Sequence, residues 1–77
     1  MYKIETLLRF YNAEFIYKNH MFYVLDIDGR IYEDNDRIYF LHGNCEVDIA
    51  YDDPNVAEYI RKYLDGFDEF EEYVNVH

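Results

Sequence analysis

The chain has 77 residues and carries 17 Asp and Glu against 7 Lys and Arg, a formal net charge of −10 at pH 7. At this length we expect a single domain over residues 1–77. Hydrophobic residues make up 51% of the chain and aromatic residues 21%, which excludes a disordered acidic tail, because such tails lack the apolar area needed to fold. The longest apolar run, Met21 to Leu25, is too short to span a bilayer, and no basic-then-apolar signal segment opens the sequence.

Two further features of the composition limit the function. The single cysteine cannot form an internal disulfide, so we expect a protein of the reducing cytoplasm. A core built from so few residues also leaves little room for an enzymatic cleft. We therefore expect a small, acidic, aromatic-rich domain that binds neither a membrane nor a cofactor.

The negative charge is concentrated in the second part of the chain. Residues 1–45 carry seven acids and five bases, whereas residues 46–77 carry ten acids and two bases. The net charges of the two parts are thus −2 and −8, and the acidic half begins at about residue 46. Because such crowding destabilises the compact state, it indicates a role beyond solubility.

The chain opens with a predicted helix from Lys3 to about Asn12, although the aromatic residues that follow would also suit an extended start. Its apolar residues recur at helical spacing: Ile4, Leu7, Leu8 and Tyr11. A strand of about Glu14 to Lys18 is predicted next, because the segment is aromatic and β-branched. The tripeptide Lys18-Asn19-His20 then indicates a turn.

The central part of the chain predicts three strands. The first runs from Met21 to Ile27 and is followed by Asp28-Gly29, a pair typical of a type I′ hairpin turn. The return strand runs from Arg30 to about Glu33. After a polar break at Asp34-Asn35-Asp36, the next predicted strand covers Arg37 to His42.

Gly43-Asn44 predicts a second hairpin, of type II′, because glycine occupies the first central position. A two-residue loop fixes three cross-strand pairs: His42 with Cys45, Phe40 with Val47, and Ile38 with Ile49. These six residues share one face, on which only the histidine is polar. The opposite face carries Tyr39, Leu41, Glu46 and Asp48. The turn and the alternation therefore predict the same register.

Asp52-Asp53-Pro54 predicts the start of a helix, because an acidic cap precedes a proline at the first helical position. An apolar stripe follows at helical spacing: Val56, Ile60, Tyr63, Leu64 and Phe67. Gly66 either ends this helix or lies within a longer one, and a second helical piece to about Tyr73 is predicted. The expected fold class is α+β: a small antiparallel sheet of four to five strands with two hairpins, a short N-terminal helix, and C-terminal helices on one face.

No pattern of residues predicts an enzyme. His42 and Cys45 are cross-strand neighbours, as an activated thiol would need, and a metal site would have to add ligands from His20, His77, Asp48 or Glu46, but neither arrangement has a recognisable spacing. The acids near the first hairpin do not fit a calcium loop and are better explained as turn residues: Asp26, Asp28, Glu33, Asp34 and Asp36. We expect no catalytic residue and no metal.

Direct binding to nucleic acid is not expected, because seven bases against seventeen acids give the wrong field for phosphates. The reverse arrangement is possible: carboxylates at phosphate-like spacing on a rigid support would resemble nucleic acid to a basic partner. Helix residues three or four apart lie roughly 5 to 6 Å from one another along the axis, close to the spacing of successive phosphates.

The last third of the chain offers such a row of carboxylates if it is helical. The row consists of Glu58, Asp65, Asp68 or Glu69, and Glu72. Four acids extend it across the sheet edge: Glu46, Asp48, Asp52 and Asp53. Tyr59 and Tyr73 are candidate aromatic contacts at such an interface. A plain solvated helix face is the alternative reading of the same acids.

Small size, net charge and a clustered set of acids give the chain a profile that resembles the phage-encoded DNA-mimic proteins. The acids concerned are Asp52, Asp53, Glu58, Asp65, Asp68, Glu69, Glu71 and Glu72. That group includes inhibitors of uracil-DNA glycosylase, of the sliding clamp and of nucleoid proteins, together with anti-restriction and some anti-CRISPR proteins. Its members share a physical strategy and no motif, so no residue role is transferred here.

The resemblance implies a viral inhibitor in the host cytoplasm. Its partner would be a basic DNA-binding host protein such as a sliding clamp, nucleoid protein, nuclease or polymerase, whose access to DNA it blocks. An alternative is an ordinary protein-interaction module or antitoxin-like partner that binds through an aromatic patch or a sheet edge. Ten tyrosines exceed what one small core can hold, so a homodimer interface is a further expectation.

Overall fold

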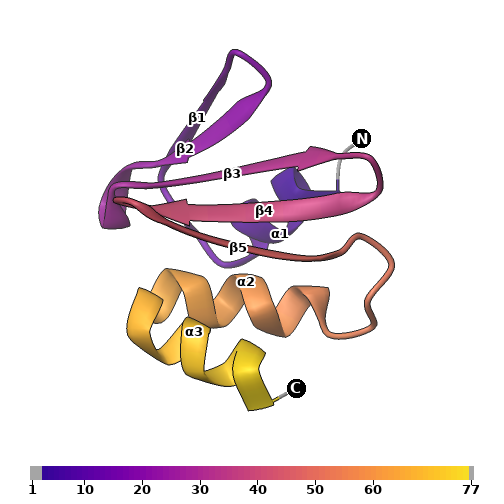
Figure 1. The fold of residues 1–77 in the computed structure, drawn as a ribbon. Coiled ribbons are helices and arrows are strands. Elements are labelled where there is room, and N and C mark those ends of the chain that lie inside the picture. The colour runs from indigo at the N-terminus through magenta and orange to yellow at the C-terminus, as the bar shows by residue number, and fades with distance from the viewer. Residues whose placement is uncertain (1–2, 77) are drawn as a thin grey trace.

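A computed structural model describes residues 3–76 and contains one antiparallel sheet with three helices on the same side of it (Figure 1). In chain order the elements are α1 (Lys3–Phe10), β1 (Phe15–Lys18), β2 (Met21–Val24), a 3₁₀ turn η1 (Leu25–Ile27), β3 (Gly29–Asp34), β4 (Arg37–His42), β5 (Cys45–Ala50), α2 (Val56–Asp65) and α3 (Phe67–Val76). The five strands are adjacent in sequence order, from β1 at one edge to β5 at the other. The predicted α+β class is therefore confirmed.

The β4–β5 hairpin has the predicted register, with His42 opposite Cys45, Phe40 opposite Val47 and Ile38 opposite Ile49. Gly43 has φ 59, and Asn44 is not among the residues with positive φ, as a type II′ turn requires. The alternation of apolar residues and the type of turn therefore predicted the same register of β4 and β5, and this register is confirmed.

The β2–β3 connection differs from the prediction. The strand from Met21 ends at Val24, not at Ile27, because Leu25–Ile27 form the 3₁₀ turn η1. Val24 pairs with Gly29, so the loop has four residues and Asp28-Gly29 is not a two-residue type I′ turn. Asp28 has the left-handed conformation, with φ 52, and Gly29 already belongs to β3.

Two hairpins use a type I′ pair that contains no glycine. At the β1–β2 turn, Asn19 and His20 have φ values of 53 and 63. The segment around Asn35 and Asp36, predicted only as a polar break, is also a two-residue turn, with φ values of 52 and 65 and with Asp34 paired to Arg37. Asn, Asp and His are the non-glycine residues found most often at positive φ, which is consistent with both turns.

The prediction that an acidic cap and Pro54 begin the helix is wrong: α2 begins at Val56, and its N-cap is Asn55, which makes no side-chain cap. Oδ1 of Asp53 accepts a hydrogen bond of 2.8 Å from the backbone N–H of Asn55, and the Val56 N–H bonds to the Asp53 carbonyl at 3.2 Å. Gly66 ends α2 through a bond from its N–H to the Lys62 carbonyl. α3 then runs to Val76, three residues beyond the predicted end.

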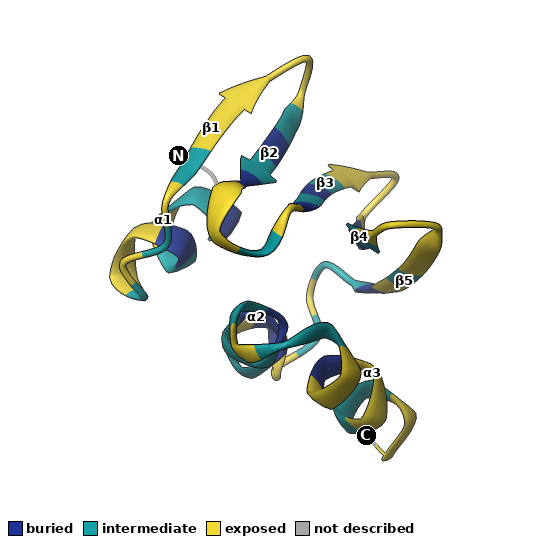
Figure 2. Cartoon of the chain, turned by 90° about the vertical axis from the view of Figure 1, so that its left-hand side faces the viewer, coloured by how far each residue is buried: buried dark blue, intermediate teal, exposed yellow. Residues whose placement is uncertain are grey.

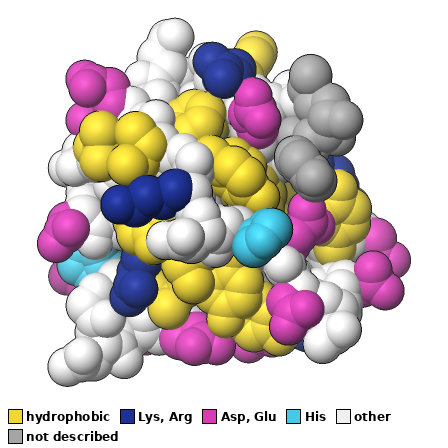
Figure 3. Space-filling model, turned by 90° about the horizontal axis from the view of Figure 1, so that it is seen from above, with side chains coloured by type: hydrophobic (Ala, Val, Ile, Leu, Met, Phe, Trp, Pro, Cys, Tyr) yellow, Lys and Arg dark blue, Asp and Glu magenta, His cyan; other side chains and the backbone are white. Residues whose placement is uncertain are grey.

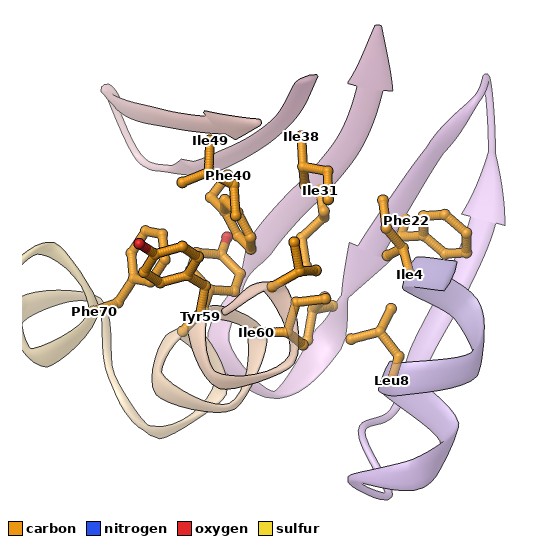
Figure 4. Close-up of a cluster of buried hydrophobic side chains, with 13 residues drawn as sticks. Ile4, Leu8, Phe22, Ile31, Ile38, Phe40, Ile49, Tyr59, Ile60 and Phe70 are labelled. Atoms are coloured by element: carbon orange, nitrogen blue, oxygen red, sulfur yellow. The ribbon is translucent and has the colours of Figure 1, made fainter. Parts of the chain in front are cut away.

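The core lies between the sheet and the helices, as the exposure colours and the close-up show (Figures 2 and 4). Its thirteen buried side chains come from every helix and from every strand except β1: Ile4, Leu8, Phe22, Val24, Ile31, Ile38, Phe40, Ile49, Val56, Tyr59, Ile60, Tyr63 and Phe70. Within residues 3–76 no helix is long and apolar enough to cross a membrane. In the part of the chain that the structure describes, the opposite face of the sheet carries no helix.

Candidate acidic interface

Helix α3 presents the densest group of acids in the structure. Phe70 lies fully buried on its inner side, with its ring centroid 4.7 Å from that of Phe40 in β4 and 5.3 Å from that of Tyr63 in α2. Phe67, Tyr73 and Val74 pack partly against the same core. This inward stripe turns the four acids outward: Asp68, Glu69, Glu71 and Glu72 are all exposed.

No base neutralises these acids from within the helix, since α3 contains no Lys or Arg. Among residues 3–76, none of the four takes part in an ion pair. Asp68 and Glu69 lie in the first turn, where the helix dipole stabilises negative charge, but Glu71 and Glu72 lie beyond it. The dipole therefore accounts for only half of the cluster.

The acids predicted on α2 are less available, because Arg61 lies between them on the same helix. Its Nη2 is 2.6 Å from Oε1 of Glu58, and its Nη1 is 3.3 Å from Oδ2 of Asp65. The hydrogen bond from Arg61 lowers the pKa of Glu58 below its ordinary value and raises that of Arg61. The predicted row is thus interrupted at its α2 end by a paired cation.

The acids predicted on β5 lie on the other side of the sheet. Val47 and Ile49 of β5 pack toward the helices, so strand alternation directs Glu46 and Asp48 to the face opposite α3. Asp48 is also paired with Arg37 of β4. The predicted extension across the sheet edge therefore does not form one surface with α3.

Figure 3 shows the molecule from above, on the side away from α2 and α3. Lys and Arg side chains lie among hydrophobic ones there, while most Asp and Glu lie toward the outline. The open face includes the stacked pair Tyr32 and Tyr39, with ring centroids 4.8 Å apart. Burial and the nearby charge of Glu46 raise the pKa of Tyr32.

Asp52 and Asp53 precede α2, near the C-terminal end of α3. Burial and, to a smaller extent, the nearby charge of Asp53 raise the pKa of Tyr59. Tyr59 contacts Tyr73 of α3 edge to face, with ring centroids 5.3 Å apart. Asp52 is exposed, whereas Asp53 is half-buried and accepts a hydrogen bond from the Asn55 N–H in the loop before the helix. These two acids therefore lie at one end of the α3 surface.

Tyr59 and Tyr73, the two tyrosines predicted to contact a partner, differ in how far they are buried. Tyr59 is 2% exposed and belongs to the core, so the prediction that it contacts a partner is wrong for this conformation. Its spacing of three from Val56 extends the buried stripe and could have been recognised. Tyr73 is half-buried and lines a shallow groove of about 250 Å³ with Lys62, Glu69, Glu72 and Val76.

The other candidate site residues do not assemble into a chemical centre. His42 and Cys45 are cross-strand neighbours as predicted, and both are exposed. The His42 ring stacks on Phe67 at 5.2 Å. Within the described part of the chain, no group of three His, Cys, Asp or Glu residues could hold a metal ion.

Sequence reasoning missed two features of this surface. Arg61 forms ion pairs with Glu58 and Asp65, three and four residues away, and both pairs could have been predicted from this spacing. Glu71 was not placed in the row, yet α3 exposes it with the others. No protein-family model, curated protein or solved structure matches this chain.

Proposed function

We propose that this protein is a non-catalytic DNA mimic, whose helix α3 binds the basic DNA-binding surface of another protein and blocks its access to DNA. The observation that carries the proposal is a set of four exposed acids on one rigid helix that form no ion pair among residues 3–76: Asp68, Glu69, Glu71 and Glu72. Carboxylates held in this way replace phosphates opposite Lys and Arg side chains of the partner.

Helical spacing supports the proposal. Asp68 with Glu72, and Glu69 with Glu72, lie four and three residues apart, so the pairs are separated by roughly 6 and 4.5 Å along the axis. The inward stripe around Phe70 holds the helix against the sheet, so the carboxylates need little ordering when a partner binds.

The groove beside these acids supplies an apolar contact. Tyr73 is half-buried there and Val76 is 75% exposed. Lys62 is the basic residue that lines this groove, and its Nζ lies 5.7 Å from the centre of the Tyr73 ring. A partner side chain with an apolar stem and a cationic end, such as arginine, fits the combination of Tyr73 with Glu69 and Glu72.

A four-site amide variant tests the proposal: Asp68→Asn, Glu69→Gln, Glu71→Gln and Glu72→Gln. Tagged wild-type protein is first used to isolate a partner from bacterial lysate, with competitor duplex DNA as a second condition. We expect DNA to displace the partner and the amide variant to bind it at least about tenfold more weakly, with an unchanged circular dichroism spectrum. Wild-type affinity should also fall between about 50 and about 500 mM NaCl.

The matched control removes the same charge elsewhere: Asp26→Asn, Asp28→Asn, Glu33→Gln and Asp36→Asn, all exposed and all outside α2 and α3. We expect this control to retain most of the binding. An ordinary interaction module predicts the opposite: little loss in the α3 variant, no displacement by DNA, and weak salt dependence. Either of the first two results would overturn the mimic.

A further inference from the structure

The two edges of the sheet differ in chemistry. Strand β5, at one edge, carries Glu46 and Asp48, and such charges discourage pairing with another chain. Strand β1, at the other edge, reads Phe15-Ile16-Tyr17-Lys18 and is mostly exposed (Figure 2). Among residues 3–76, β1 pairs with β2 and no strand lies on its other side. Of the four residues of β1, only Lys18 at its end is charged.

Exposed hydrophobic side chains gather around this edge. Of the five large hydrophobic residues that are well exposed within the described chain, four belong to α1, β1 or η1: Phe10, Ile16, Tyr17 and Leu25. A groove of about 420 Å³ runs between α1 and β1 and is lined in part by Arg9, Phe15 and Leu25. This is the arrangement of an interaction surface.

The charge distribution favours a second copy of the chain at this end. Residues 1–25 carry three bases and two acids, whereas residues 26–77 carry four bases and fifteen acids. The net charges are thus +1 and −11. Two copies that met through their acidic parts would repel one another, but the β1 ends can approach without this cost.

The hairpin geometry fixes which backbone groups face outward. The Leu25 N–H bonds to the Glu14 carbonyl at 2.8 Å, and pairs alternate along an antiparallel ladder, so Glu14, Ile16 and Lys18 bond toward β2. The backbone groups of the residues between them, beginning with Phe15, point away from β2. Those groups can form the next ladder of the sheet.

We propose that two copies of this protein pair along β1, antiparallel, about a two-fold axis at Ile16, and so form one ten-stranded sheet. In this register Phe15 lies opposite Tyr17 of the second copy, and Ile16 lies opposite its own equivalent. Glu14 then lies opposite Lys18 of the second copy, twice per dimer. Because Glu14 and Lys18 occupy non-hydrogen-bonded positions of the new ladder, their side chains come close together.

The proposed register places complementary side chains opposite one another on both faces of the sheet. On the helix side, Phe15 and Tyr17 already contact Phe22, with ring centroids 5.7 and 4.6 Å apart, and the second copy extends this aromatic cluster. On the open side, opposite charges flank two isoleucines. The two α3 surfaces remain exposed and outside the new interface, so this inference does not depend on the proposed function.

Charge reversal tests the pairing by sedimentation equilibrium over a wide range of protein concentration. We expect wild-type protein to form a dimer, and Glu14→Lys and Lys18→Glu each to raise the dimer dissociation constant on the order of tenfold, because two opposite-charge pairs become like-charge pairs. The double variant restores both pairs with reversed polarity, so it should dimerise about as well as wild type.

The control is Glu46→Lys on β5, which changes the net charge by the same amount as Glu14→Lys but lies at the other edge. We expect it to dimerise at least as well as wild type, because a smaller net charge weakens repulsion. A protein that stays monomeric throughout the range overturns the proposal. So does a dimer that tolerates both single reversals, or a double variant weaker than each single one.

Discussion

Gly29 and Tyr63 meet where α2 packs on the sheet. The Tyr63 hydroxyl donates a hydrogen bond to the Leu41 carbonyl in β4, and the Arg30 carbonyl in β3 lies 3.4 Å from the same oxygen. Burial raises the pKa of this tyrosine to about 12. A Cβ on Gly29 would collide with that hydroxyl and would lie 3.0 Å from Tyr63 Cζ. Glycine is therefore required here for close approach and not for a turn.

At this position we predict that Gly29→Ala destabilises the protein by about 1–3 kcal/mol, because the tyrosine must leave its hydrogen bond or the sheet must shift. Urea unfolding at neutral pH measures the change. Gly66→Ala is the matched control, since a Cβ there meets nothing within 4 Å and its φ of 163 is extended. We expect the control to be stabilised by up to about 1 kcal/mol. Equal losses in both variants would contradict the steric explanation.

The same glycine shows why one turn was predicted wrongly. Asp-Gly is a pair typical of a two-residue hairpin turn. The neighbouring sequence does not indicate that Gly29 contacts Tyr63, which lies thirty-four residues later. The tertiary contact of Tyr63 decided the role of Gly29. By contrast, Gly43 was placed correctly because its turn and the alternation on both sides agree.

At the scale of elements, the helix pair α2–α3 was predictable in outline and less so in its charge. The apolar spacing gave both helices, and Gly66 was recognised as a point where α2 could end. The partly paired state of the acids on α2 depends on Arg61, whose two partners lie at the spacings of an intrahelical pair. The face on which the β5 acids lie follows from strand alternation, but only once the side covered by the helices is known.

For Arg61 we predict that Arg61→Gln lowers the thermal unfolding temperature at pH 7 and low salt, because Glu58 and Asp65 lose their cation. The pKa of Glu58 is lowered in the folded state, so its contribution is present above the ordinary value of 4.5 and is lost as pH falls below it. The difference between wild type and variant should therefore shrink from pH 6 toward about pH 3 and also at high salt. A difference that persists at low pH would show that the arginine acts through packing of its stem.

On the scale of the whole molecule, charge and apolar exposure are separated along the chain. The acidic excess lies after residue 25, with its densest part on α3, and most of the exposed large hydrophobic residues lie near β1. The sequence revealed the first asymmetry directly, because charges can be counted. The gathering of exposed hydrophobic residues near β1 can be recognised only when the strand order is known, since an edge strand and a central strand can have the same composition.

The acidic surface has a cost that can be measured without any partner. The four α3 carboxylates form no ion pair among residues 3–76, so they repel one another and the rest of a molecule of net charge −10, and salt screens that repulsion. We predict that NaCl raises the unfolding temperature of wild type by a few degrees, equivalent to roughly 1 kcal/mol in a domain of this size. The four-site α3 amide variant should have a higher unfolding temperature at low salt and a smaller increase with salt. The unfolding temperature of the four-site control outside α2 and α3 should respond nearly as much as that of wild type. Protein concentration is held fixed, because dimerisation would itself shift the transition. An unfolding temperature that falls with salt, or equal responses in both variants, would show that α3 holds no concentrated repulsion, and the basis for a phosphate-like surface would be lost.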